Sequence, residues 1–137
     1  MRRILLLLIV PFLFLSCERI YINGELDGMW KLHSVESVDT VVYPVGIYYS
    51  FQRHLVRLGE HYEQGFPDYY LAEFDKVSDT LTMFKFYKYP VDLGISDSKE
   101  LEKYYIFSDT VRFCVEALDS KLMILTNNAL RYNFIKW

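Results

Sequence analysis

Histidines, carboxylates and serines are the side chains through which this chain could catalyse a reaction or hold a metal. His54 and His61 are the closest pair of histidines, and the oxygen donors Tyr62 and Glu63 follow them. An odd number of positions separates the two histidines, so on one strand they would point to opposite faces and could not share a zinc ion. No Gly-x-Ser-x-Gly segment is present, and no local pattern links a serine, a histidine and an aspartate. The sequence therefore predicts no enzyme, no metal site and no cofactor.

The two cysteines have different surroundings. Cys17 directly follows a short apolar run, whereas Cys114 lies in a strand-like run at residues 111–116 with no histidine beside it. A lone cysteine in such a strand is most simply a small buried hydrophobe. We therefore predict no disulfide and no reactive thiol at Cys114.

The first residues of the chain indicate export. Arg2 and Arg3 precede an apolar run at residues 4–15, and Ser16 is a small residue before Cys17. This order is typical of a secretory signal, and the run is shorter than the roughly 20 residues that a membrane-spanning helix needs. The segment Phe14-Leu15-Ser16-Cys17 resembles the box of bacterial lipoproteins, which implies that residues 1–16 are removed and that Cys17 is diacylated on sulfur. An ordinary secretory signal with a chance cysteine is the alternative.

Acylation would anchor the protein in the cell envelope. Several acyl chains hold a protein on a membrane essentially permanently, and export with lipidation implies an outer membrane as the expected site. Glu18 does not decide between the periplasmic and the surface leaflet. After removal of the signal, 13 basic side chains remain against 18 acidic ones. With no basic stripe, nucleic acid is not an expected partner.

The mature chain divides into a polar tether at residues 17–27 and one domain at residues 28–137. Aromatic residues make up 18% of the chain and include 12 tyrosines, which favours strands over helices. Apolar and polar residues alternate in segments separated by turn signals, which predicts an antiparallel all-β fold of about eight strands. The expected strands are residues 29–38, 47–52, 54–60, 70–77, 80–88, 111–118, 121–126 and 130–136. One short helix is expected at residues 97–105, before the last strands, because Asp97 and Glu100 have capping-box spacing.

A sheet of this kind can remove its exposed edges by closing into an up-and-down barrel. The side chains expected inside are Trp30, Leu32, Phe51, Phe74, Phe84 or Phe86, Phe113 and Phe134. Alternation is poor around Phe84, where apolar groups fall on both faces. Since so many of these groups are large, a filled core and an open cup both remain possible.

The segment Leu26-Asp27-Gly28-Met29-Trp30-Lys31-Leu32 resembles the Gly-x-Trp start of lipocalin-like barrels. With Cys17 shortly before it, the segment resembles especially that of the small lipocalin-like lipoproteins of Bacteroides-type bacteria. The resemblance implies that Gly28 turns the chain into the first strand and that Trp30 plugs the closed end of the barrel. In lipocalins a late arginine packs over this tryptophan, and Arg131 is the residue matched to it. The chain lacks the Thr-Asp-Tyr segment of the familiar eukaryotic members.

The resemblance and the tyrosines lead to two functional hypotheses, and a hydrolase or other enzyme ranks a distant third, since it would require a convergent polar cluster in a cleft. The first is a membrane-anchored module that binds a small apolar or amphipathic molecule, with its ligand-binding residues unknown. The second is a structural or interaction lipoprotein with a filled core, which contacts an envelope protein or a glycan through surface tyrosines. Three tyrosine doublets, at residues 48–49, 69–70 and 104–105, suggest such a surface, since neighbours on a strand point to opposite faces.

Overall fold

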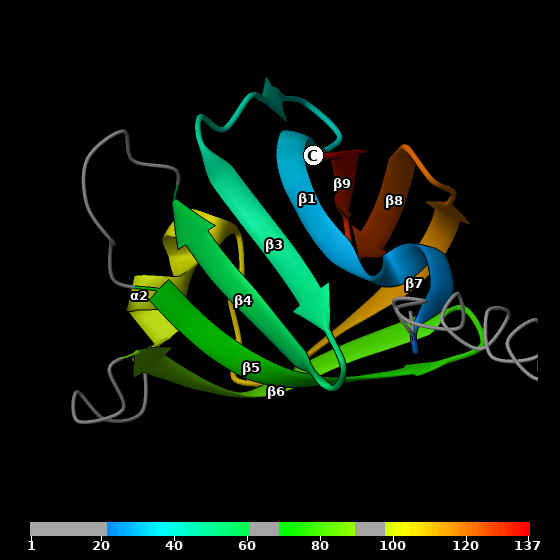
Figure 1. The fold of residues 1–137 in the computed structure, drawn as a ribbon. Helices are drawn as coiled ribbons and strands as arrows, with labels where there is room; N and C mark the ends of the chain where they lie inside the picture. The colour runs from blue at the N-terminus through cyan, green and yellow to red at the C-terminus, as the bar shows by residue number, and fades with distance from the viewer. Residues whose placement is uncertain (1–21, 61–68, 90–97) are drawn as a thin grey trace, which may run out of the picture.

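The computed structural model describes residues 22–60, 69–89 and 98–137. Its strands form one nine-stranded sheet in the order β2-β1-β3-β4-β5-β6-β7-β8-β9, and β1 also pairs with β9 (Figure 1). All of these pairs are antiparallel. Strands β1 and β3–β9 therefore close into a ring, while β2 extends one edge of β1. This confirms the antiparallel up-and-down barrel. Residues 1–16 and Cys17 lie outside the described residues.

The strands lie close to the predicted ranges. They span Gly28–Glu36 (β1), Val41–Val42 (β2), Ile47–Gln52 (β3), Leu55–Glu60 (β4), Tyr69–Val77 (β5), Thr80–Tyr89 (β6), Val111–Leu118 (β7), Leu122–Asn127 (β8) and Leu130–Lys136 (β9). The predicted bounds of β3, β7 and β9 are confirmed, and the other predicted strands differ by at most two residues at an end. Strand β2 was not predicted, because a two-residue strand shows no alternation.

The interior holds the expected aromatic and aliphatic side chains. The buried residues among those predicted are Trp30, Leu32, Phe51, Phe74, Phe86, Phe113 and Phe134. A β-bulge decides between Phe84 and Phe86. Glu73 pairs with Phe84 and Leu71 with Tyr87, so Lys85 and Phe86 share one partner position, and Lys85 has a positive φ of 55°. The extra residue shifts the alternation and turns Phe86 inward.

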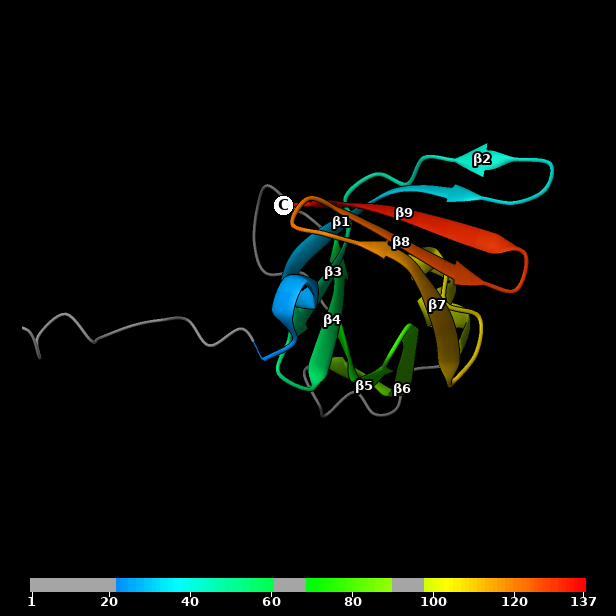
Figure 2. The ribbon, with the colours of Figure 1, turned by 90° about the vertical axis from the view of Figure 1, so that its right-hand side faces the viewer.

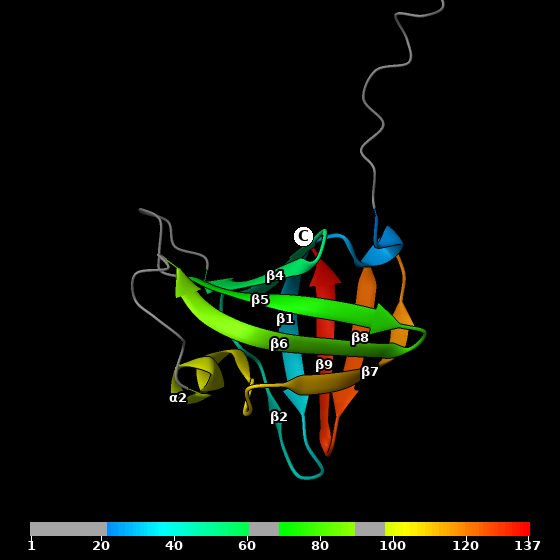
Figure 3. The ribbon, with the colours of Figure 1, turned by 90° about the horizontal axis from the view of Figure 1, so that it is seen from below.

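The predicted helix is present as two short pieces, α2 (Ser98–Leu101) and the 3-10 turn η4 (Glu102–Tyr104). It ends at Tyr105, whose φ of 62° is left-handed. Asp97 and its proposed cap lie outside the described residues. Figures 1 and 3 show α2 beside the end of β6, so the helix covers one end of the barrel. No helix within the described ranges is long and apolar enough to cross a membrane.

The two ends of the barrel differ. The 3-10 turn η2 (Gly24–Leu26) lies at the end where β1 begins and β9 finishes, which we call the closed end. Leu26 is fully buried, so the folded domain includes residues that the sequence assigned to the tether. The opposite end, covered by α2 and η4, is the mouth. Figure 2 shows β2 projecting at the end away from η2.

Candidate functional site

Trp30 closes the narrow end of the barrel. Its side chain is fully buried, and its indole Nε1 donates a hydrogen bond of 2.9 Å to the carbonyl of Leu26. The ammonium of Lys136 lies 4.4 Å from the centre of the Trp30 ring. Lys136 also donates to the carbonyl of Glu25 at 3.2 Å and to that of Asp27. The turn η2, the indole and the lysine therefore form one plug, held by backbone carbonyls and a cation–π contact.

Gly28 occupies a position beside this plug where a larger residue would be strained. Its φ is +119°, and a Cβ atom there would lie 2.9 Å from both Cε and Nζ of Lys136. Only glycine adopts such a conformation at little cost. The structure thus brings Gly28 and Trp30 together at the closed end, where the Gly-x-Trp pattern placed them.

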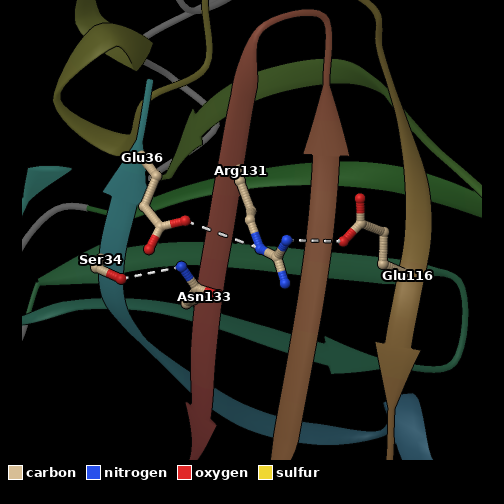
Figure 4. Close-up of polar contacts among 5 residues, drawn as sticks. All are labelled: Ser34, Glu36, Glu116, Arg131 and Asn133. Atoms are coloured by element: carbon tan, nitrogen blue, oxygen red, sulfur yellow. Dashed lines mark hydrogen bonds and ion pairs between the residues drawn. The ribbon is translucent and has the colours of Figure 1, made fainter. Parts of the chain in front are cut away.

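The prediction for Arg131 is wrong, because Lys136 takes the position over Trp30. In the register of β1 with β9, Trp30 pairs with Lys136, whereas Arg131 pairs with Glu36 near the mouth. Arg131 lies outside the barrel, with Nε 3.9 Å from Glu36 and Nη1 3.4 Å from Glu116 (Figure 4). The alternation itself carried the signal, since Lys136 shares the inward face of β9 with Tyr132 and Phe134, and Arg131 does not.

Tyrosine hydroxyls hold the helical segment across the mouth. The hydroxyl of Tyr49 donates to the carbonyl of Tyr104 at 2.5 Å, and that of Tyr132 donates to the carbonyl of Tyr105 at 2.6 Å. The hydroxyl of Tyr70 bonds the Glu100 carboxylate at 2.8 Å. These donors come from β3, β9 and β5, so three separate walls of the barrel fix one segment.

Tyr49 and Tyr132 keep their protons to unusually high pH. Burial raises the pKa of Tyr49 well above its ordinary value, and the nearby Tyr132 and Tyr104 hydroxyls add to this effect. Burial also raises the pKa of Tyr132 to about 12. The hydroxyls are therefore neutral donors at physiological pH, suited to a carbonyl or another uncharged acceptor.

Large side chains of the described residues occupy the barrel interior between plug and mouth. The largest fully buried side chains are Trp30, Tyr49, Tyr104, Tyr132, Phe51, Phe113 and Phe134. Leu101, Tyr104 and Ile106, from the segment that covers the mouth, belong to the same core cluster. Two open depressions lie on the outer surface. One of about 730 Å³ includes Arg112 and Cys114, and one of about 670 Å³ includes Glu25, Lys136 and Trp137 at the closed end.

Two tyrosine doublets place one ring inside the barrel and one outside. Tyr49 and Tyr70 are inside. Outside, the Tyr69 ring stacks on Tyr89 with centres 4.7 Å apart and planes at 14°, and Arg57 lies 5.4 Å from the centre of Tyr69. The outer ring of the first doublet, Tyr48, is only 8% exposed. The third doublet belongs to the helical segment, not to a strand.

The remaining candidates for chemistry lie apart. Cys114 is exposed, not buried as predicted, because it alternates with the inward residues of β7. His33 and His54 are exposed on the barrel, and His61 lies outside the described residues. Within the described part of the chain, no three histidine, cysteine, aspartate or glutamate side chains come together as a metal site.

Comparison with known proteins agrees with this geometry. The model of a family described as a lipocalin-like domain matches residues 12–137. The crystal structure of a lipocalin-like protein from Bacteroides uniformis is similar, with a TM-score of 0.67 and 19% identity over 83% of this chain and 100% of the other. An uncharacterized protein from Bacteroides eggerthii has a TM-score of 0.62 and 21% identity over 82% of this chain and 99% of the other. No curated protein matches significantly. Because the family model covers almost all of the chain, the protein belongs to the lipocalin-like domain family.

Proposed function

We propose that this protein is an envelope lipoprotein, anchored through acyl chains on Cys17, that binds a small apolar or amphipathic molecule at the mouth of its barrel. The export signal and the cysteine that follows it support the anchor. Membership of the lipocalin-like family supports a binding role over an enzymatic one, since such barrels enclose one small ligand.

The composition of the mouth is the observation that carries this proposal. At the mouth, Leu101, Tyr104 and Ile106 of the covering segment belong to the core together with residues of the barrel strands. Hydrogen bonds from Tyr49 and Tyr132 to the carbonyls of residues 104 and 105 hold this segment in place. A ligand that displaced the segment would meet an apolar, aromatic space with the same hydroxyls as donors. A molecule with one polar acceptor and an apolar body suits that space.

Native mass spectrometry of the protein purified from its own envelope tests both parts. Acylation adds covalent mass at Cys17, and a bound molecule adds mass that leaves on denaturation. In the Tyr49→Phe and Tyr132→Phe variants we expect the bound mass to change in occupancy, whereas Arg131→Ala, on the outer wall, serves as the matched control. Absence of noncovalent mass from every preparation would exclude the ligand-binding role.

A second candidate is an interaction lipoprotein with a permanently filled core. The stacked pair Tyr69 and Tyr89, with Arg57 against Tyr69, favours it, because aromatic and arginine side chains are enriched at binding surfaces. The partner would be an envelope protein or a glycan. A preparation without ligand that retains a second polypeptide, and loses it in a Tyr89→Ser variant, would support this candidate over the first.

A further inference from the structure

Exposed apolar side chains gather around the closed end of the barrel. This group, the closed-end rim, consists of Ile22, Leu122, Ile135 and Trp137, which are 67%, 51%, 41% and 69% exposed. Leu122 and Ile135 are partners across β8 and β9. The depression at the closed end extends from Gly24 to Ser120 and Trp137, and so links the chain segments that carry the rim. Monomeric soluble proteins rarely expose such groups together without a partner.

The distance along the chain between Cys17 and the closed end favours one partner. The turn η2 begins at Gly24, at the closed end of the barrel. If Cys17 carries the acyl chains, as proposed above, only residues 17–21 separate the lipid from Ile22. Five residues reach about 18 Å at most when fully extended. The anchor therefore keeps the closed end next to the membrane surface.

We propose that the closed-end rim rests on the lipid surface of the membrane in which Cys17 is anchored. Tryptophan favours the membrane–water interface, because its apolar ring can contact lipid while its N–H remains hydrated. Lys121 is exposed directly before Leu122, and Lys31 is the partner of Ile135. Lysine side chains at this level can bury their methylenes and keep the ammonium among phosphate groups. Lipid thus complements both the apolar side chains of the rim and the lysines Lys31 and Lys121 beside it.

A second exposed apolar group lies in the connection that contains β2, at the opposite end of the barrel (Figure 2). Its members are Val38, Val41, Val42, Tyr43 and Val45. Strand β9, with seven residues, is about 24 Å long, so this group is farther from the anchor than the tether can span. An upright barrel presents the rim to lipid and directs the β2 connection away, which makes that connection a matched control.

Fluorescence quenching in vesicles tests the orientation. The probe is a Cys114→Ser chain coupled through Cys17 to a maleimide lipid, in phosphatidylethanolamine–phosphatidylglycerol vesicles with brominated acyl chains. The chain has two tryptophans, and a Trp137→Ser variant measures the background from buried Trp30. We expect bromine to quench Trp137 and vesicles to protect it from aqueous iodide. A Tyr43→Ser, Val45→Ser variant should behave like the parent. If iodide quenches Trp137 equally with and without vesicles, the proposal is overturned.

Binding without the anchor gives an independent measurement. The Cys17→Ser chain should partition weakly into the same vesicles. When Leu122→Ser and Trp137→Ser are combined in that chain, its partition coefficient should fall about tenfold or more, because two large apolar side chains no longer enter the lipid. The Tyr43→Ser, Val45→Ser variant should not change it. Equal losses in the two variants would contradict the rim. Acylation is read separately from the mass of the envelope protein, so failure of the anchor and failure of the rim are distinguishable.

Discussion

Replacement of Gly28 by alanine tests the plug at the closed end. The new Cβ would lie 2.9 Å from Cε and Nζ of Lys136, in a backbone conformation with φ of +119°. That conformation costs a residue with a side chain about 1–3 kcal/mol. The lysine tip can move away, but it then leaves the carbonyls of Glu25 and Asp27 and the Trp30 ring. These contacts are partly exposed, so their loss adds about 1–2 kcal/mol. We expect Gly28→Ala to lower the free energy of unfolding by the sum of these two costs, about 2–5 kcal/mol.

Gly24→Ala is the matched control. Gly24 also has a positive φ, of +60°, but an added Cβ would meet nothing within 4 Å. Its cost should be the backbone strain alone, about 1–2 kcal/mol. Urea unfolding, followed by the fluorescence of buried Trp30, measures both variants on the chain without its signal.

A double-mutant cycle with Lys136→Ala separates strain from lost contacts. In the alanine background Gly28→Ala no longer displaces an ammonium group, so its cost should fall by about 1–2 kcal/mol. If the two substitutions are additive, or if Gly24→Ala is as costly as Gly28→Ala, the steric reasoning about Lys136 is refuted.

Other substitutions and conditions test the remaining contacts. Lys136→Ala should destabilise the fold by about 1–3 kcal/mol, while Arg131→Ala, which loses only exposed ion pairs, should cost less than about 1 kcal/mol in the same urea assay. Since the folded pKa of Tyr132 is about 12 and its ordinary value is 10.0, the contribution of Tyr132 to stability should be constant below pH 10 and fall as the pH rises toward 12. Across that pH range the urea midpoint of the Tyr132→Phe variant should fall less than that of the parent. If the two midpoints fall equally with pH, the raised pKa of Tyr132 is contradicted. Cys114 should react with a thiol reagent in the native state, because it is exposed. Reaction only after unfolding would show that it is covered.

Alternation was sufficient to predict β7 and β9, because buried and solvated residues alternate along most of each strand. It failed at β6, where Lys85 introduces a bulge and reverses the inward face partway along the strand. A single sequence does not show where the extra residue is accommodated, so Phe84 and Phe86 could not be told apart.

The candidate site was predictable only as far as local patterns reach. Gly28 and Trp30 are two positions apart on one strand, and the resemblance of this Gly-x-Trp segment to lipocalin-like barrels implied their roles. The residue over Trp30 comes from the neighbouring strand β9, which pairs with β1. The family pattern pointed to Arg131, whereas the alternation of inward and outward side chains along β9 favoured Lys136. The carbonyls that accept from Tyr49 and Tyr132 lie 55 and 27 positions away along the chain. No local signal predicts such partners, because they depend on how the helical segment packs over the mouth.

The two ends of this barrel are suited to different tasks. At the closed end the turn η2 directly precedes the plug, so the proposed lipid anchor would join the domain next to Trp30. The mouth would then face away from the membrane, and the proposed ligand would meet α2 and η4 first. In that arrangement the hydrogen bonds of Tyr49 and Tyr132 to the covering segment, and not the Trp30 plug, would control access to the core. Strength at one end and adjustable contacts at the other can vary independently, since residues that far apart contribute nearly additively.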